Sequence, residues 1–164
     1  MGMLFGSLIL IRDIESFGFE LILIMFISVW ACDSFAFIFG KYFGKMKIWP
    51  SISPNKTWLG TTMGLVSSIL SVYIFYRYGD KFGFNFQKIK TILNMNDVIS
   101  LGIIFGGVGQ LGDFFESLLK REVGIKDSSK ILKGHGGILD RFDSILLVAP
   151  SLYIYIEIIL KGRL

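Results

Sequence analysis

The sequence consists of long apolar stretches separated by short clusters of charge. A membrane-spanning helix needs about 20 consecutive, mostly apolar residues to cross roughly 30 Å of hydrocarbon. Because 52% of the 164 residues are apolar and only 18% are charged, the polar side chains are too few to cover a water-soluble core. The sequence therefore predicts an all-α, polytopic bundle of about four transmembrane helices. The stretches are 19–39, 57–78 and 98–119, with a shorter fourth one at 144–160.

A short apolar segment, residues 3–11, precedes the first of these stretches. It is too short to cross a bilayer alone, and charged residues follow it directly in place of the small-residue cleavage site of a secretory signal. The single cysteine, Cys32, excludes an internal disulfide and a cysteine-based metal centre. We expect residues 1–164 to form one membrane-embedded domain.

The basic residues are distributed unequally between the two sides of the predicted bundle. The connecting segments 40–56 and 120–143 lie on one side and hold ten lysines and arginines, whereas the opposite side holds seven. Basic residues are enriched in cytoplasmic loops of membrane proteins. We therefore predict that both segments face the cytoplasm.

Three acidic residues, Asp33, Asp113 and Glu116, fall inside predicted spans. An acid near the bilayer centre costs at least ~2.5 kcal/mol and usually faces a polar interior. Asp33 lies seven residues before Gly40 and Asp113 seven before Lys120, which places each about 10 Å inside the same face. We predict that they share one pocket, with Glu116 on the same helix face as Asp113. Alternatively, these acids pair with loop lysines and only hold the bundle together.

Segment 120–143 combines the residue types that phosphate chemistry on a metal ion requires. Its glycines allow close approach of the backbone to an anion, and its basic side chains can neutralise phosphate oxygens. Asp140 and Asp143 are three residues apart, so both reach one hard cation if this stretch is helical. Together with Asp113 they predict an oxygen-rich site for Mg²⁺. The residues expected to face phosphate are Gly134, Gly136, Gly137, Lys120, Lys126, Arg121 and Arg141.

Two further features have both a functional and a structural interpretation. His135 is the only histidine, and we favour substrate binding or loop ordering over general-base catalysis because phosphoryl transfer works mainly by positioning and charge neutralisation. We expect Ser53 and Asn55 to cap the following helix and Lys56 to stand at its N-terminal end, as an anion site would require. An ordinary helix start with Trp58 as an interfacial anchor fits that spacing equally well.

Three segments resemble those of a known family. Residues 117–143 resemble the long C-terminal signature of the phosphatidate cytidylyltransferases, also called CDP-diacylglycerol synthases. Residues 33–45 are similar to the family's Asp-(Thr/Ser)-x-Ala-(Tyr/Phe)-x-x-Gly-Arg-x-Phe-Gly-Lys segment, and residues 52–60 to its Ser-Pro-x-Lys-Thr-Trp-Glu-Gly segment. The departures are Lys41 for Arg, Leu59 for Glu and Lys133 for Pro or Gly. Family members generally carry more helices before this region, so we expect a chain that is short at its N-terminus.

The resemblance implies transfer of the cytidylyl group of CTP to phosphatidic acid, with Mg²⁺ as the cofactor. It implies an integral protein of the bacterial inner membrane with its active site toward the cytoplasm. Asp113 and Asp140 would hold the metal with help from Asp143, and Asp113, Asp140 and Lys126 would be catalytic. The residues implied to bind substrate are Ser53, Lys56, Thr57, Ser117, Lys120, Arg121, Asp127, His135, Gly136, Gly137 and Arg141.

Other functions remain open at this point. The acceptor could be a different lipid phosphate, or the chain could be an inactive relative that only binds lipid or a partner subunit. A transporter or channel could use the intramembrane acids as an ion path. We expect the lipid bilayer as a partner and no nucleic acid, and a homodimer is compatible with the sequence.

Overall fold

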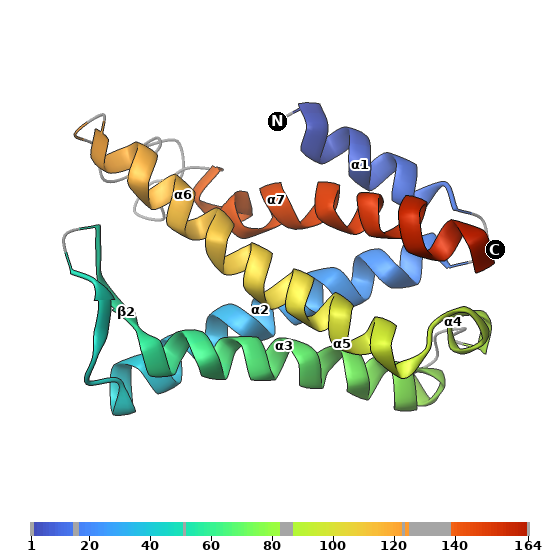
Figure 1. Cartoon of the computed structure of the whole chain (residues 1–164), viewed down its shortest axis with the longest axis horizontal. Helices are drawn as coiled ribbons and strands as arrows, with labels where there is room; N and C mark the ends of the chain where they lie inside the picture. The colour runs from blue at the N-terminus through green and yellow to red at the C-terminus, as the bar shows by residue number, and fades with distance from the viewer. Residues whose placement is uncertain are drawn as a thin grey trace.

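The computed structural model describes residues 2–14, 17–50, 52–82, 87–122, 124 and 139–163, and of residues 3, 4, 82 and 139–141 it describes the backbone alone. Within these residues, four helices are long and apolar enough to cross a membrane: Gly18–Phe43, Trp58–Lys81, Met95–Glu122 and Phe142–Arg163. The predicted polytopic helix bundle is confirmed (Figure 1). The fourth span runs from Phe142 to Arg163, beyond both ends of the predicted stretch 144–160, and Glu157 within it pairs with Lys161 at 2.6 Å.

The third and fourth spans are each built from several helical segments in sequence. A π-helical turn, η2, interrupts the third span, and a second π-helical turn, η3, lies near the end of the fourth, where the short 3₁₀ helix η4 follows it. The helices are α1 (Gly2–Arg12), α2 (Gly18–Phe43), α3 (Trp58–Tyr78), η1 (Gly79–Phe82), α4 (Gln87–Ile92), α5 (Met95–Ile103), η2 (Ile104–Val108), α6 (Gly109–Glu122), α7 (Leu139–Tyr155), η3 (Ile156–Leu160) and η4 (Lys161–Arg163).

The first two spans pack closely because small residues face each other along their contact. Cys32, Ala36 and Gly40 recur every four residues on α2, and Gly60 and Gly64 lie opposite them on α3. A Cβ added at Gly60 would lie 2.5 Å from the Ala36 carbonyl oxygen, and one at Gly64 would lie 2.9 Å from that of Cys32. Apolar helices gain little by leaving lipid for each other, so such close packing supplies the association energy.

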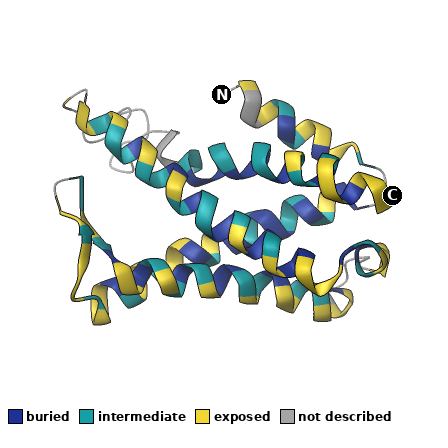
Figure 2. Cartoon of the chain, in the orientation of Figure 1, coloured by how far each residue is buried: buried dark blue, intermediate teal, exposed yellow. Residues whose placement is uncertain are grey.

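A similar close approach joins the third span to the fourth. A Cβ at Gly112 of α6 would lie 2.6 Å from the carbonyl oxygen of Asp143, in the first part of α7. This approach brings Asp143 beside Asp113. Figure 2 shows the buried residues on the inward faces of the helices and the exposed residues on their outward faces. The largest fully buried side chains include Phe105, Leu21, Ile24, Met25, Leu101, Ile145 and Leu152.

A short hairpin precedes α3 and corrects one prediction. Strand β1 (Lys47–Trp49) pairs antiparallel with β2 (Ser53–Thr57), with Trp49 opposite Ser53. The prediction that Ser53 and Asn55 cap the next helix is therefore wrong, because both lie in the extended strand. The cap is Thr57, whose Oγ1 accepts a hydrogen bond from the Gly60 backbone N–H at 3.1 Å. Only the residue just before the helix can reach its first free N–H groups.

The hairpin, the end of α6 and the start of α7 lie at one end of the bundle (Figure 1). At the other end, Asp97 fastens the third span to the fourth. Asp97 is 2% exposed and accepts hydrogen bonds from the Tyr155 hydroxyl and from Arg163 Nη1, both at 2.6 Å, besides forming a capping box with Asn94. The charge pattern along the sequence did not single out this contact.

We predict that Gly64→Ala destabilises the bundle, since its methyl group would meet the Cys32 carbonyl and the Ala36 side chain. Overpacking of this kind costs about 1–3 kcal/mol. Thermal unfolding in detergent measures the effect, with Gly6→Ala as the matched control because a Cβ there meets nothing within 4 Å. Equal melting temperatures for the two variants would contradict the close-packed contact between α2 and α3.

Candidate active site

A polar cavity of about 210 Å³ lies within the bundle, close to the hairpin. Asp33 from α2 and Asp113 from α6 both line it, which confirms that the two acids share one pocket. Gly40 and Gly60 bring α2 and α3 together beside it. The lining residues are Asp33, Ala36, Phe37, Asn55, Lys56, Thr57, Gly60, Thr61, Gln110 and Asp113.

An ion pair between Lys56 and Asp113 lies at the centre of this cavity wall. Lys56 Nζ, from β2, is 2.7 Å from Asp113 Oδ2, and both side chains are about one-third exposed or less. The same ammonium group lies 5.8 Å from the centroid of the Phe114 ring. Charges attract each other more strongly in such surroundings than in bulk water. The hairpin is thereby fastened to the third span, with a cation beside an intramembrane carboxylate.

Further acids gather around this pair. The carboxyl group of Asp143 lies close to those of Glu116 and Asp113, and Asp33 is near enough to both Asp113 and Asp143 to interact electrostatically with them. Lys120 Nζ lies 3.4 Å from Glu116 Oε1. Carboxylates from three spans therefore lie together, and their mutual repulsion favours a cation among them. The structural alternative also holds in part, because Asp113 and Glu116 do pair with lysines.

The other predicted site residues are distributed as follows. Ser117, Lys120 and Arg121 lie on the last turns of α6, and Arg121 Nε donates a hydrogen bond to the Ile52 carbonyl at 3.4 Å, beside the hairpin. Asp140 and Arg141 lie in the first turn of α7, so the helical spacing on which the metal hypothesis depends is present, but their side chains lie outside the described part of the chain. Lys126, Asp127, His135, Gly136 and Gly137, and the loop glycine Gly134, also lie outside the described residues.

Among the residues that the structure describes, no group of three or more His, Cys, Asp or Glu side chains is arranged as a ready-made metal site. The predicted ligand set of Asp113, Asp140 and Asp143 includes one side chain, that of Asp140, that lies outside the described residues. The donor chemistry nevertheless fits a hard cation, since Asp113 and Asp143 place two carboxyl groups near each other. The assignment of Mg²⁺ stays a prediction.

Gln110 is a polar residue of the site that the sequence analysis did not identify. Its amide Nε2 donates to the Thr61 carbonyl oxygen and to Cys32 Sγ, each at 3.1 Å, so it joins the first three spans. The sequence contains a pattern that could have identified Gln110, because this residue is polar within an apolar span and lies three residues before Asp113, on the same helix face. The π-helical turn η2 ends two residues before it, and such turns often accompany functional sites.

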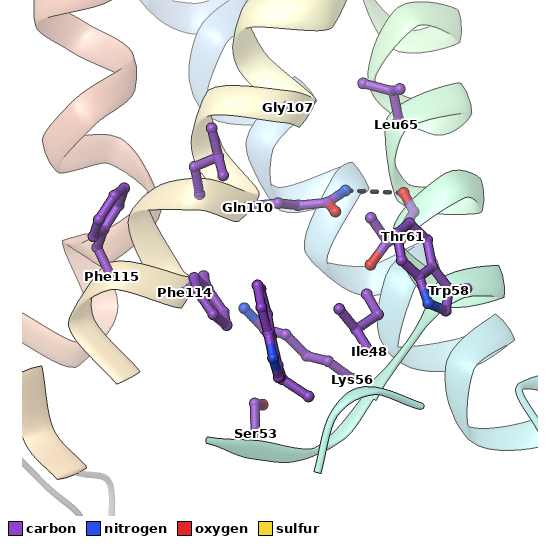
Figure 3. A pocket seen from close by; sticks show the side chains of 12 residues that line it. Ile48, Ser53, Lys56, Trp58, Thr61, Leu65, Gly107, Gln110, Phe114 and Phe115 are labelled. Atoms are coloured by element: carbon purple, nitrogen blue, oxygen red, sulfur yellow. Dashed lines mark hydrogen bonds between the residues drawn. The ribbon is translucent and has the colours of Figure 1, made fainter. Parts of the chain in front are cut away.

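A second, larger cavity adjoins the polar one. It has a volume of about 440 Å³ and lies between the hairpin, α3 and the third span (Figure 3). At its edge the rings of Trp49 and Phe114 stack with their centroids 5.0 Å apart. Its lining is mostly apolar and consists of Ile48, Trp49, Ser53, Lys56, Trp58, Thr61, Leu65, Gly107, Gln110, Leu111, Phe114 and Phe115.

The chain is similar to known proteins over most of its length. The model of the cytidylyltransferase family matches residues 1–159. A phosphatidate cytidylyltransferase of Bacillus subtilis (strain 168) is 42% identical over 153 residues, which are 93% of this chain and 53% of the relative. A protein of the same name from Staphylococcus haemolyticus is 46% identical over 140 residues, covering 85% of this chain and 50% of the relative. One from Staphylococcus aureus (strain COL) is 45% identical over 144 residues, covering 87% and 51%.

The chain thus spans about half the length of the curated relatives that it matches. The matched region contains the hairpin, the four spanning helices up to residue 159 and the acids that meet around Lys56. On the extent of the family match and on these identities, the chain belongs to the cytidylyltransferase family.

Proposed function

We propose that this chain carries the cytidylyl-transfer site of a phosphatidate cytidylyltransferase. CTP and phosphatidic acid would react there to give CDP-diacylglycerol and pyrophosphate. The observation that carries the proposal is the Lys56–Asp113 pair, which places a cation and a carboxylate in a polar cavity within the membrane-spanning helices. The family match and the names of the relatives support the same reaction.

The reaction balances as a nucleotidyl transfer. An oxygen of the phosphatidic acid phosphate attacks the α-phosphorus of CTP, a new P–O bond forms, and the bond to the β-phosphate breaks so that pyrophosphate leaves. Attacker and target are both anionic, so charge neutralisation and alignment supply most of the rate. Lys56 lines the cavity, Arg121 contacts the hairpin at Ile52, and Lys120 pairs with Glu116. All three cations can neutralise phosphate oxygens.

A divalent cation fits the proposed reaction. Mg²⁺ is commonly coordinated by one or two carboxylates together with substrate phosphates and water. A site without three preformed protein ligands is therefore consistent with Mg²⁺ binding. We propose Asp113 and Asp143 as ligands, with Asp140 as a third. When bound, the ion would neutralise charge that develops on the triphosphate.

The position of the cavity suits a reaction between a lipid and a soluble nucleotide. The lipid phosphate lies at the headgroup level, and Asp33 and Asp113 lie inside the spans just below the hairpin. CTP reaches this end of the bundle if it faces the cytoplasm. The excess of basic residues on this side supports that orientation in a bacterial inner membrane.

Two alternatives remain tied to particular observations. No described residue selects phosphatidic acid over another lipid phosphate, so a different lipid phosphate as acceptor fits the same site. The pairing of Asp113 with Lys56 and of Glu116 with Lys120 also fits a structural role in which these acids hold the bundle together. Turnover assays separate these possibilities.

We predict that the purified chain in detergent releases pyrophosphate from CTP only when phosphatidic acid and Mg²⁺ are both present. Enzymatic detection of pyrophosphate measures the rate. Phosphatidylcholine, which lacks a free phosphate monoester, is the matched lipid control. Retained binding of CTP without any turnover would contradict the proposal and favour the inactive relative.

We predict that Asp113→Asn and Asp140→Asn each lower this rate by about 100-fold or more, because removing one preorganised charge from such a site costs that much. The control is Asp80→Asn, which removes the carboxylate that pairs with Lys90 in a different part of the structure. Thermal unfolding of each variant separates loss of activity from loss of fold. Near-normal rates in both site variants would exclude the metal assignment.

A further inference from the structure

The apolar cavity has one cationic end and one apolar end. Figure 3 shows Lys56 and Ser53 toward one end, and Leu65 and Gly107 toward the other. Its volume of about 440 Å³ falls within the range of about 300–1,000 Å³ that is typical of small-molecule sites. An elongated ligand with an anionic head and an apolar tail matches this distribution.

The apolar cavity also shares part of its lining with the polar cavity. Lys56, Thr61 and Gln110 line both cavities. A ligand in the apolar cavity with its head at Lys56 therefore places that head beside Asp113, where the proposed reaction takes place. The two cavities together provide room for both parts of a lipid phosphate.

We propose that this cavity holds one acyl chain of the acceptor lipid and thereby positions the lipid's phosphate at Lys56. The inference rests on the proposed function and adds the place of the chain. A chain that moves from the bilayer into an apolar cavity exchanges one apolar environment for another, so transfer contributes little affinity. The cavity acts mainly by fixing where the phosphate lies, and the attraction of the phosphate to Lys56 supplies the selectivity for lipids with an anionic head.

Gly107 determines the space at the apolar end. A Cβ there would meet nothing closer than Ile103 Cγ2 at 3.9 Å and Leu65 Cδ1 at 4.0 Å. Its neighbours in the same span differ, because a Cβ at Gly102 would lie 2.6 Å from the Ile69 Cα and one at Gly106 would lie 2.9 Å from the Ser68 Cβ. A larger side chain at Gly107 can therefore enter the cavity without displacing a packed helix.

Two of the three tryptophans report on this cavity. Trp49 and Trp58 line it and are 53% and 55% exposed, whereas Trp30 lies on α2 away from its lining. In a Trp30→Phe background, emission therefore comes from the two cavity tryptophans alone. Bromine atoms on an acyl chain quench tryptophan fluorescence at short range, so a brominated lipid detects occupancy of the cavity.

The experiment compares brominated-chain phosphatidic acid with phosphatidylcholine that carries the same chains, in detergent micelles and without CTP. We expect saturable quenching by phosphatidic acid, at least twofold above the phosphatidylcholine background. Gly107→Leu should remove most of that excess. The control variant Val66→Leu enlarges an exposed side chain of α3 that lines a different apolar surface, and it should leave the excess unchanged.

Equal quenching by the two lipids overturns the proposal, and this comparison needs no cavity variant. An undiminished excess in a folded Gly107→Leu variant also overturns it. The outcomes separate the inference from the proposed function. Selective quenching without pyrophosphate release supports the acyl-chain site and contradicts the proposed function. Pyrophosphate release without selective quenching supports the proposed function and contradicts the acyl-chain site.

Discussion

The arrangement at the hairpin end of the bundle depends on placing positive charge beside carboxylates within membrane-spanning helices. Asp33, Asp113, Glu116 and Asp143 would be expensive in lipid and repel one another. Lys56 reaches Asp113 from outside the spans, because the hairpin turns the chain back over the bundle before α3 begins. The hairpin therefore both neutralises an intramembrane charge and forms one wall of two cavities.

Close helix contacts make this meeting of charges possible. Gly60 and Gly64 allow α3 to approach α2 near Asp33, and Gly112 allows α7 to approach α6 so that Asp143 reaches Asp113. Without an aqueous hydrophobic effect to hold spans together, contacts across small residues fix their spacing. The apolar cavity lies open beside Gly107, where an added Cβ would meet only Ile103 Cγ2 at 3.9 Å and Leu65 Cδ1 at 4.0 Å. A few glycines therefore set the spacing of the helices, and another leaves room in the apolar cavity.

Much of this could be predicted from the sequence, and the part that could not has physical reasons. Apolar length identified the four spans, and equal depth below two loops placed Asp33 and Asp113 in one pocket. The hairpin was missed because strand pairing between residues 47–49 and 53–57 overrode the local capping signals of Ser53 and Asn55. Gln110 and Asp97 were missed because their roles depend on partners 49 to 78 residues away along the chain.

We propose that the acids around Lys56 bind a divalent cation at the site of phosphate chemistry. Mn²⁺ can replace Mg²⁺ at oxygen-rich sites, and electron paramagnetic resonance counts how many Mn²⁺ ions the chain binds in detergent. We predict that the Asp113→Asn/Asp143→Asn double variant binds at least one ion fewer than the unaltered chain, while its melting temperature shows that it remains folded. Equal numbers of bound ions in the two proteins would contradict the proposal.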